Sequence, residues 1–141
     1  KAKELGAAAI INGKDEDAVE RIMSLTNGRG ADLAIETAGT EITANQAIHA
    51  VRKGANIVMD GYSKSGKMNL DMSLALDKEV TFKTVFRYRH IYPMAIEAVA
   101  SGKVRVKDIV TNIFTLDDIQ NAMDQSVSNK AEIVKSVIKI C

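Results

Sequence analysis

Three short apolar segments, each following a glycine, recur through the first half of this 141-residue chain. They occupy residues 7–11, 31–35 and 55–59. Between them, residues 16–26 and 41–53 carry apolar side chains at the spacing of one helix face. Glycine suits the end of a helix because the left-handed conformation common there costs it nothing. Strands and helices that alternate in this way predict βαβ units and a doubly wound α/β fold with a parallel sheet.

The second half of the chain is less regular but continues as mixed helix and strand. Residues 80–88 are rich in β-branched and aromatic side chains, which favours a strand. Residues 91–101 predict a helix with Pro93 in its first turn, where a missing N–H costs nothing. Thr115 is predicted to start another helix, its hydroxyl accepting a hydrogen bond from an early N–H, and residues 132–140 predict a final strand.

Charge and cysteine content exclude several function classes. The 19 basic and 18 acidic side chains leave a net charge of +1, too little for the field that binds nucleic acid or an anionic membrane surface. No apolar run approaches the roughly 20 residues that span a bilayer. Cys141 is the only cysteine, which excludes internal disulfides and cysteine-based zinc sites and makes a cysteine nucleophile improbable. We therefore expect a cytoplasmic protein with no nucleic-acid partner and no membrane partner.

Ligands of open α/β sheets bind beyond the carboxyl ends of the strands, so three strand ends are candidate sites. The first, residues 36–39, combines small residues with a glycine, and an ordinary tight turn is the favoured explanation. The second, 60–62, places an acid and a glycine at a strand end, with a plain turn as an equal alternative. The third, 86–89, presents guanidinium and phenol groups that suit hydroxyl or carboxylate oxygens, or else forms a solvated basic strand end.

Two features of a complete dinucleotide-binding domain are missing from the sequence. The loop GxGxxG, which holds a pyrophosphate at a helix N-terminus, is absent. The acidic residue that grips the cofactor ribose about 20 residues later is absent as well. The chain also begins without Met, and its first residues, KAKELG, resemble the last turns of a helix. We therefore expect a truncated domain.

Four segments in order, KAKELGAAAIIN, GADLAIETAG, GANIVMDGYS and FKTVFRYR, followed by YPMAIEAVASGKV and IVTNIFTLDDIQNAM, carry a family resemblance. Together they resemble the coenzyme-binding domain of zinc-containing medium-chain dehydrogenases. VFRY followed by a helix that begins with YP resembles the polyol branch of that family, the sorbitol (L-iditol) dehydrogenases. The resemblance implies a partial Rossmann fold that lacks its first two strands. In the strand order 3-2-1-4-5-6, residues 7–11 would then form a third strand separated from the rest.

The resemblance also implies a set of site residues at the three strand ends. For the cofactor these are Thr37 and Gly39 on the adenosine side, Asp60, Gly61 and Tyr62 along the nicotinamide, and the backbone of Val85, Phe86 and Arg87 at the carboxamide. The side chains of Arg87 and Tyr88 match the pair that contacts polyol hydroxyls. Asp60 departs from the family, in which an apolar residue is more usual at this position. The resemblance implies no catalytic residue and no metal ligand within this chain.

The implied activity is the transfer of a hydride from a secondary alcohol of a polyol of the sorbitol or xylitol type to NAD, with zinc as Lewis acid. The family's zinc ligands lie in an N-terminal domain, so residues 1–141 would be a truncated dinucleotide-binding domain plus the C-terminal tail, and inactive alone. Unpaired strand edges, and a sheet that the family extends across a dimer near residues 67–72, predict a homo-oligomer. Alternatives are a threonine or butanediol dehydrogenase, a nucleotide-sensing module without catalysis, and an α/β interaction domain.

Overall fold

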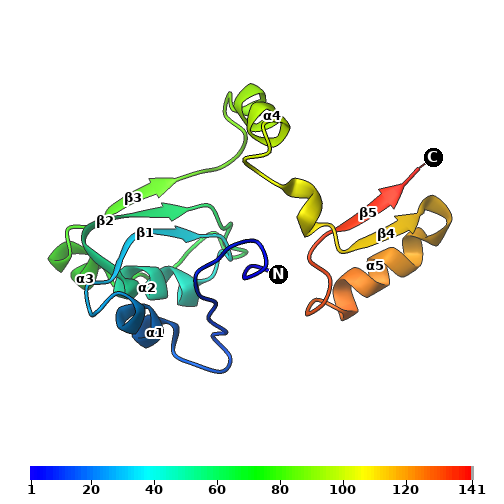
Figure 1. The fold of residues 1–141 in the computed structure, drawn as a ribbon. Helices are drawn as coiled ribbons and strands as arrows, with labels where there is room; N and C mark the ends of the chain where they lie inside the picture. The colour runs from blue at the N-terminus through cyan, green and yellow to red at the C-terminus, as the bar shows by residue number, and fades with distance from the viewer. Residues whose placement is uncertain (141) are drawn as a thin grey trace. The chain divides into compact units, whose positions relative to one another are not determined.

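The computed structural model describes residues 1–140 as an α/β chain made of two compact units (Figure 1). Ala9–Arg87 forms one unit, and Lys1–Ala8 together with Tyr88–Cys141 forms the other. Cys141, for which the sequence predicts no catalytic role, lies outside the described residues.

The first unit is a three-stranded parallel sheet with helices on one side of it (Figure 1). Its elements are α1 (Ala18–Leu25), β1 (Ala31–Glu36), α2 (Glu41–Ala50), β2 (Val51–Met59), α3 (Met72–Asp77) and β3 (Thr81–Thr84). The strand order is β1-β2-β3, so each crossover helix joins neighbouring strands. This order confirms the prediction of an α/β fold with a partial Rossmann-like parallel sheet.

Side-chain caps explain where the helices of this unit begin. The Asp17 carboxylate accepts a hydrogen bond from the backbone N–H of Glu20 at 2.9 Å, and the Thr40 hydroxyl accepts one from Thr43 at 3.2 Å. Each bond satisfies an N–H that the first turn of a helix leaves without an intrahelical acceptor. The core then forms between α2, β2 and α3, where five buried apolar residues cluster: Ile48, Val51, Ala55, Ile57 and Ala75.

Helix α2 ends three residues before the predicted boundary because the backbone at Val51 is already extended. The register between β1 and β2 shifts there: Ala31 lies opposite Val51, whereas Leu33 lies opposite Asn56. The extra residues of β2 form a bulge. The ammonium group of Lys78 donates hydrogen bonds of 2.7–3.1 Å to the backbone carbonyls of Ile48, His49 and Val51, and so satisfies the carbonyls at the end of α2.

Two predicted strands differ from the structure. Residues 7–11 are irregular, because a strand needs a partner for its backbone groups and no described residue pairs with this segment. The predicted strand 80–88 is regular only as β3, and one further hydrogen bond continues it, from Val85 N–H to the Met59 carbonyl at 3.0 Å. The outer edge of β1 is likewise unpaired among the described residues, with Leu33 51% and Ile35 62% exposed.

The second unit contains α4 (Tyr92–Ala100), η1 (Val106–Ile109), β4 (Asn112–Thr115), η2 (Leu116–Asp118), α5 (Ile119–Ser128) and β5 (Ser136–Lys139). Strands β4 and β5 pair in parallel, with α5 in the connection between them. Pro93 lies in the first turn of α4, as predicted. The Thr115 cap is wrong: its hydroxyl makes no capping bond, because a 3₁₀ turn precedes α5 and separates Thr115 from the free N–H groups of the α-helix.

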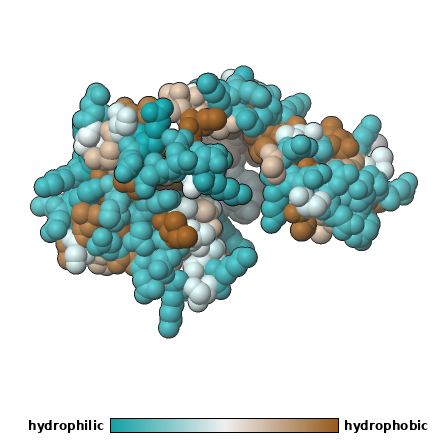
Figure 2. All heavy atoms as spheres, turned by 90° about the horizontal axis from the view of Figure 1, so that it is seen from below, coloured by the Kyte–Doolittle hydropathy of each residue, from teal (hydrophilic) through white to brown (hydrophobic). Residues whose placement is uncertain are grey.

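The surface carries scattered apolar residues between polar ones on the face shown in Figure 2. Within residues 1–140, no helix is long and apolar enough to cross a membrane.

Candidate functional site

The carboxyl ends of the three parallel strands meet at one edge of the sheet. Glu36 lies opposite Met59, and Met59 lies opposite Thr84. The residues that follow these three therefore leave the sheet side by side. This is the arrangement that the sequence predicts for a ligand site.

A cavity of about 620 Å³ opens beyond the ends of β2 and β3. The six residues that the resemblance assigns to the cofactor at these two strand ends line it, and Tyr88 does not: Asp60, Gly61, Tyr62, Val85, Phe86 and Arg87. The structure thus brings together, in one hollow, residues that are more than twenty positions apart in the sequence.

The walls of this cavity combine exposed apolar surface with unused hydrogen-bond donors. Tyr62 is 81% exposed and Phe86 is 73% exposed, which is unusual for large rings. The Arg87 guanidinium carbon lies 4.8 Å from the centre of the Phe86 ring, in a cation–π contact. No hydrogen bond within residues 1–140 uses the backbone N–H of Phe86 or Arg87. Such a site suits a flat ring that carries a polar amide.

The first strand end is organised by Glu36, which the sequence reasoning missed as a functional residue. The residue is buried, with 4% exposure. Its Oε1 atom accepts hydrogen bonds from the backbone N–H groups of Ala38 at 2.8 Å and Gly39 at 2.9 Å, and from the Thr43 hydroxyl at 2.7 Å. The carboxylate therefore closes the turn after β1. The available signal was an acid at the end of an apolar strand, followed by a glycine turn and a threonine on the next helix.

Gly39 and Gly61 pack backbone against backbone. A Cβ on Gly61 would lie 2.6 Å from Oε2 of Glu36, and one on Gly39 would lie 2.5 Å from the carbonyl oxygen of Tyr62. The N–H groups of Asp60 and Gly61 both donate to the Glu36 carbonyl, at 2.9 and 3.0 Å. Oε2 itself is buried and accepts no hydrogen bond from the described residues. The ends of β1 and β2 are thus joined into one rigid junction.

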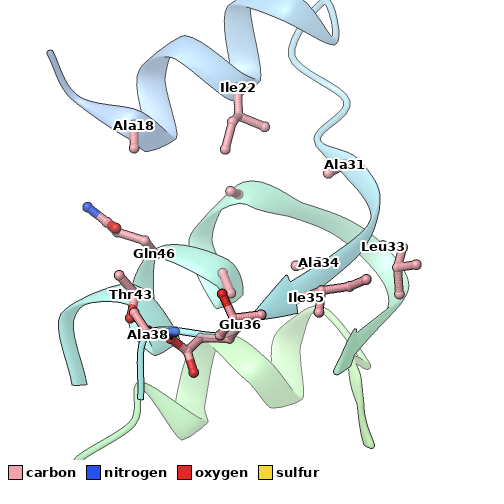
Figure 3. A pocket seen from close by; sticks show the side chains of 13 residues that line it. Ala18, Ile22, Ala31, Leu33, Ala34, Ile35, Glu36, Ala38, Thr43 and Gln46 are labelled. Carbon is pink, nitrogen blue, oxygen red and sulfur yellow. Dashed lines mark hydrogen bonds between the residues drawn. The ribbon is translucent and has the colours of Figure 1, made fainter. Parts of the chain in front are cut away.

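A second hollow of about 370 Å³ lies between β1 and the helices α1 and α2 (Figure 3). Its lining is mostly apolar, with Ala18 and Ile22 from α1 facing Ala34 of β1. Thr37 lines this hollow rather than the larger cavity. Gly39 lines neither of the two. Of the two predicted adenosine-side residues, Thr37 therefore lies in the smaller hollow, whereas Gly39 contacts Gly61 and Tyr62 at the neighbouring strand end.

Tyr88 belongs to the second compact unit, whereas Arg87 ends the first. The Tyr88 ring packs against the ring of Tyr92, with centroids 5.2 Å apart and planes inclined by 55°. Its role beside Arg87 stays a prediction. Within residues 1–140, no three histidine, cysteine, aspartate or glutamate side chains gather closely enough to hold a metal ion. The described residues therefore do not fit a zinc site.

Comparisons with known proteins place the chain in a family. A family model described as zinc-binding dehydrogenase matches residues 1–101. An uncharacterised zinc-type alcohol dehydrogenase-like protein of Escherichia coli is 43% identical over 139 residues, which are 99% of this chain and 40% of that protein. The sorbitol dehydrogenase of Bacillus subtilis is 36% identical over 137 residues, 97% of this chain and 39% of that enzyme.

Solved structures give the same result. An Escherichia coli oxidoreductase/dehydrogenase of unknown specificity superposes with a TM-score of 0.89 at 42% identity, over 99% of this chain and 40% of that one. An alcohol dehydrogenase from a Thermus species superposes with a TM-score of 0.87 at 27% identity, over the same shares of the two chains. This chain spans about two fifths of the length of these relatives.

Proposed function

Because this chain belongs to the zinc-binding dehydrogenase family, we propose that it is part of an NAD-dependent oxidoreductase that oxidises a secondary alcohol of a polyol. The observation that carries the proposal is the single cavity at the ends of β2 and β3, lined by the six residues expected along a nicotinamide. We further propose that residues 1–141 are a truncated dinucleotide-binding domain with a C-terminal tail. In this proposal the zinc ligands lie outside these residues.

The residues of the cavity fit a nicotinamide ring. Val85 and Phe86 offer apolar surface for the ring, and the unused N–H groups of Phe86 and Arg87 suit the oxygen of its carboxamide. The cofactor, when bound, supplies the hydride acceptor. The protein's own part is to hold the ring at a fixed distance from the substrate and to exclude water from one face of it.

Arg87 is the proposed substrate contact within the first unit. Its guanidinium group is anchored over the Phe86 ring and keeps its N–H donors in a fixed fork. Hydroxyl oxygens of a polyol are acceptors of the kind that such a fork orients. Tyr88 is proposed as the second contact. Relatives that carry the names sorbitol dehydrogenase and D-xylulose reductase support a polyol rather than a simple alcohol.

The complete natural protein that carries this chain tests the proposal. We expect NADH to form from NAD with sorbitol or xylitol, and more slowly with 2,3-butanediol or threonine. Arg87→Ala should raise KM for the polyol about 10- to 100-fold, because a charged hydrogen-bond donor is lost. Arg89→Ala removes a nearby cation that does not line the cavity, and should change KM less than about twofold. NAD binding without turnover of any alcohol would instead indicate a sensor, and failure to bind NAD would refute the proposal.

A further inference from the structure

Asp60 places a negative charge at the rim of the cavity proposed for the nicotinamide ring. We propose that this carboxylate makes the cavity select the oxidised cofactor, whose ring is cationic, over the reduced cofactor, whose ring is neutral. The inference rests on the proposed function and adds a determinant of cofactor redox state to it.

The backbone of Asp60 is held firmly at the cavity rim. Its N–H donates to the Glu36 carbonyl at 2.9 Å, and it directly follows the last residue of β2, Met59. The residue is exposed and lines the cavity. Within residues 1–140 its carboxylate forms no ion pair within 4.0 Å and accepts no hydrogen bond. The charge is therefore not neutralised by a contact.

Two other charged groups lie close to Asp60, and they act differently. The Glu36 carboxylate is buried beneath the turn and its Oε1 atom is already occupied by three donors. The Arg87 guanidinium lines the same cavity and is held over the Phe86 ring. It opposes the field of Asp60 in part. Both groups are unchanged by a substitution at Asp60, so a change in cofactor binding caused by Asp60→Asn reports the charge of Asp60 itself.

The two cofactor forms differ at the ring by one unit of charge, while the rest of the molecule is the same. A fixed charge near the ring therefore changes the dissociation constant of one form and not of the other. For a charge at the rim of the cavity and an effective dielectric between those of water and of a protein surface, the interaction corresponds to a factor of about 3 to 10 in Kd. A cavity with this preference is also less inhibited by the NADH that it releases.

The test measures Kd for NAD and for NADH separately in the complete protein that carries this chain. NADH is titrated by fluorescence, and NAD by calorimetry or by displacement of NADH. Asp60→Asn should raise Kd for NAD about 3- to 10-fold and leave Kd for NADH within about twofold. Asp60→Glu keeps the charge and should keep the ratio of the two constants near that of the unchanged protein.

Asp77→Asn is the matched control. Asp77 is also exposed, but it ends α3 ahead of β3, at the strand end opposite the cavity. Its removal changes the net charge by the same amount and should leave the ratio of the two constants unchanged. If Asp60→Asn leaves the ratio of the two dissociation constants unchanged, this inference is overturned while the proposed function still stands. Binding of neither cofactor form by the unchanged protein would overturn the proposed function together with it.

Discussion

At the scale of single residues, the junction between Glu36, Gly39 and Gly61 fixes the shape of the site. Each glycine occupies space that the other's turn needs, and the carboxylate holds the first turn closed. The sequence left two explanations open for these glycines, a ligand site or a plain turn, with the turn favoured at Gly39 and the two equal at Gly61. It is the protein backbone that comes close to each of them. The sequence of one strand end does not show which atoms of the neighbouring strand end are in contact with it.

Gly61→Ala should therefore destabilise the first unit. Its Cβ would lie 2.1 Å from the Gly39 nitrogen, so a turn has to move. We expect the free energy of unfolding to fall by about 1–3 kcal/mol, as measured by urea denaturation. Gly13→Ala is the control, because a Cβ there meets nothing within 4 Å. Equal stability of the two variants would show that the turns at Gly39 and Gly61 can move apart at no cost.

At the scale of elements, the sequence predicts best those segments whose secondary structure is determined by residues close to them in the chain. The strand β1 and the helix α4 lie within one residue of their predicted bounds, whereas β2 begins four residues earlier than predicted, inside the segment predicted as helix. Residues 7–11 have the composition of a strand but remain irregular, because pairing depends on a distant partner. The Thr115 cap fails for a related reason: a 3₁₀ turn, which leaves no clear trace in the sequence, comes before the α-helix.

Lys78 ties the end of α2 to the segment before β3. Its ammonium group donates to three backbone carbonyls, and burial lowers the pKa of this amine because the charged form loses hydration. Lys78→Met removes the three bonds and also the cost of burying a charge. We expect a net loss of about 1–3 kcal/mol in the free energy of unfolding, measured by urea denaturation.

Lys64→Met serves as the reference for this substitution, since Lys64 is exposed and its ammonium group forms no ion pair within the described residues. It should change stability by less than about 0.5 kcal/mol. If Lys78→Met proves as stable as this reference, the three carbonyls are satisfied equally well by water.

At the scale of the whole molecule, the order of the sheet could be predicted because right-handed crossovers leave few choices for neighbouring strands. The position of the cavity at the ends of β2 and β3 followed from the rule that ligands bind beyond the carboxyl ends of parallel strands, and the cofactor roles of its residues came from the family resemblance alone. The buried role of Glu36 could not be predicted, because an acid after an apolar strand looks like a solvent-facing strand end until the turn that encloses it is known. The division into two compact units was also not visible, because no linker or change of composition marks Arg87.

The unpaired edge of β1 leads to a prediction about assembly of the isolated 141-residue chain. Leu33 and Ile35 are half or more exposed along an edge whose backbone groups lack a partner among the described residues. Such an edge favours pairing with another chain. We expect dimers or larger species by size-exclusion chromatography with light scattering. Leu33→Lys should shift the population toward monomer, and a monomeric unchanged chain would contradict the prediction.

The close contact between Gly39 and Gly61 has a consequence for how this surface can vary over time. Once a side chain at either position has pushed the two turns apart, a side chain at the other meets room already made. The costs of the two changes are then less than additive. The first substitution therefore causes most of the loss in stability. We expect the two glycines to be kept together or lost together in descendants of this chain.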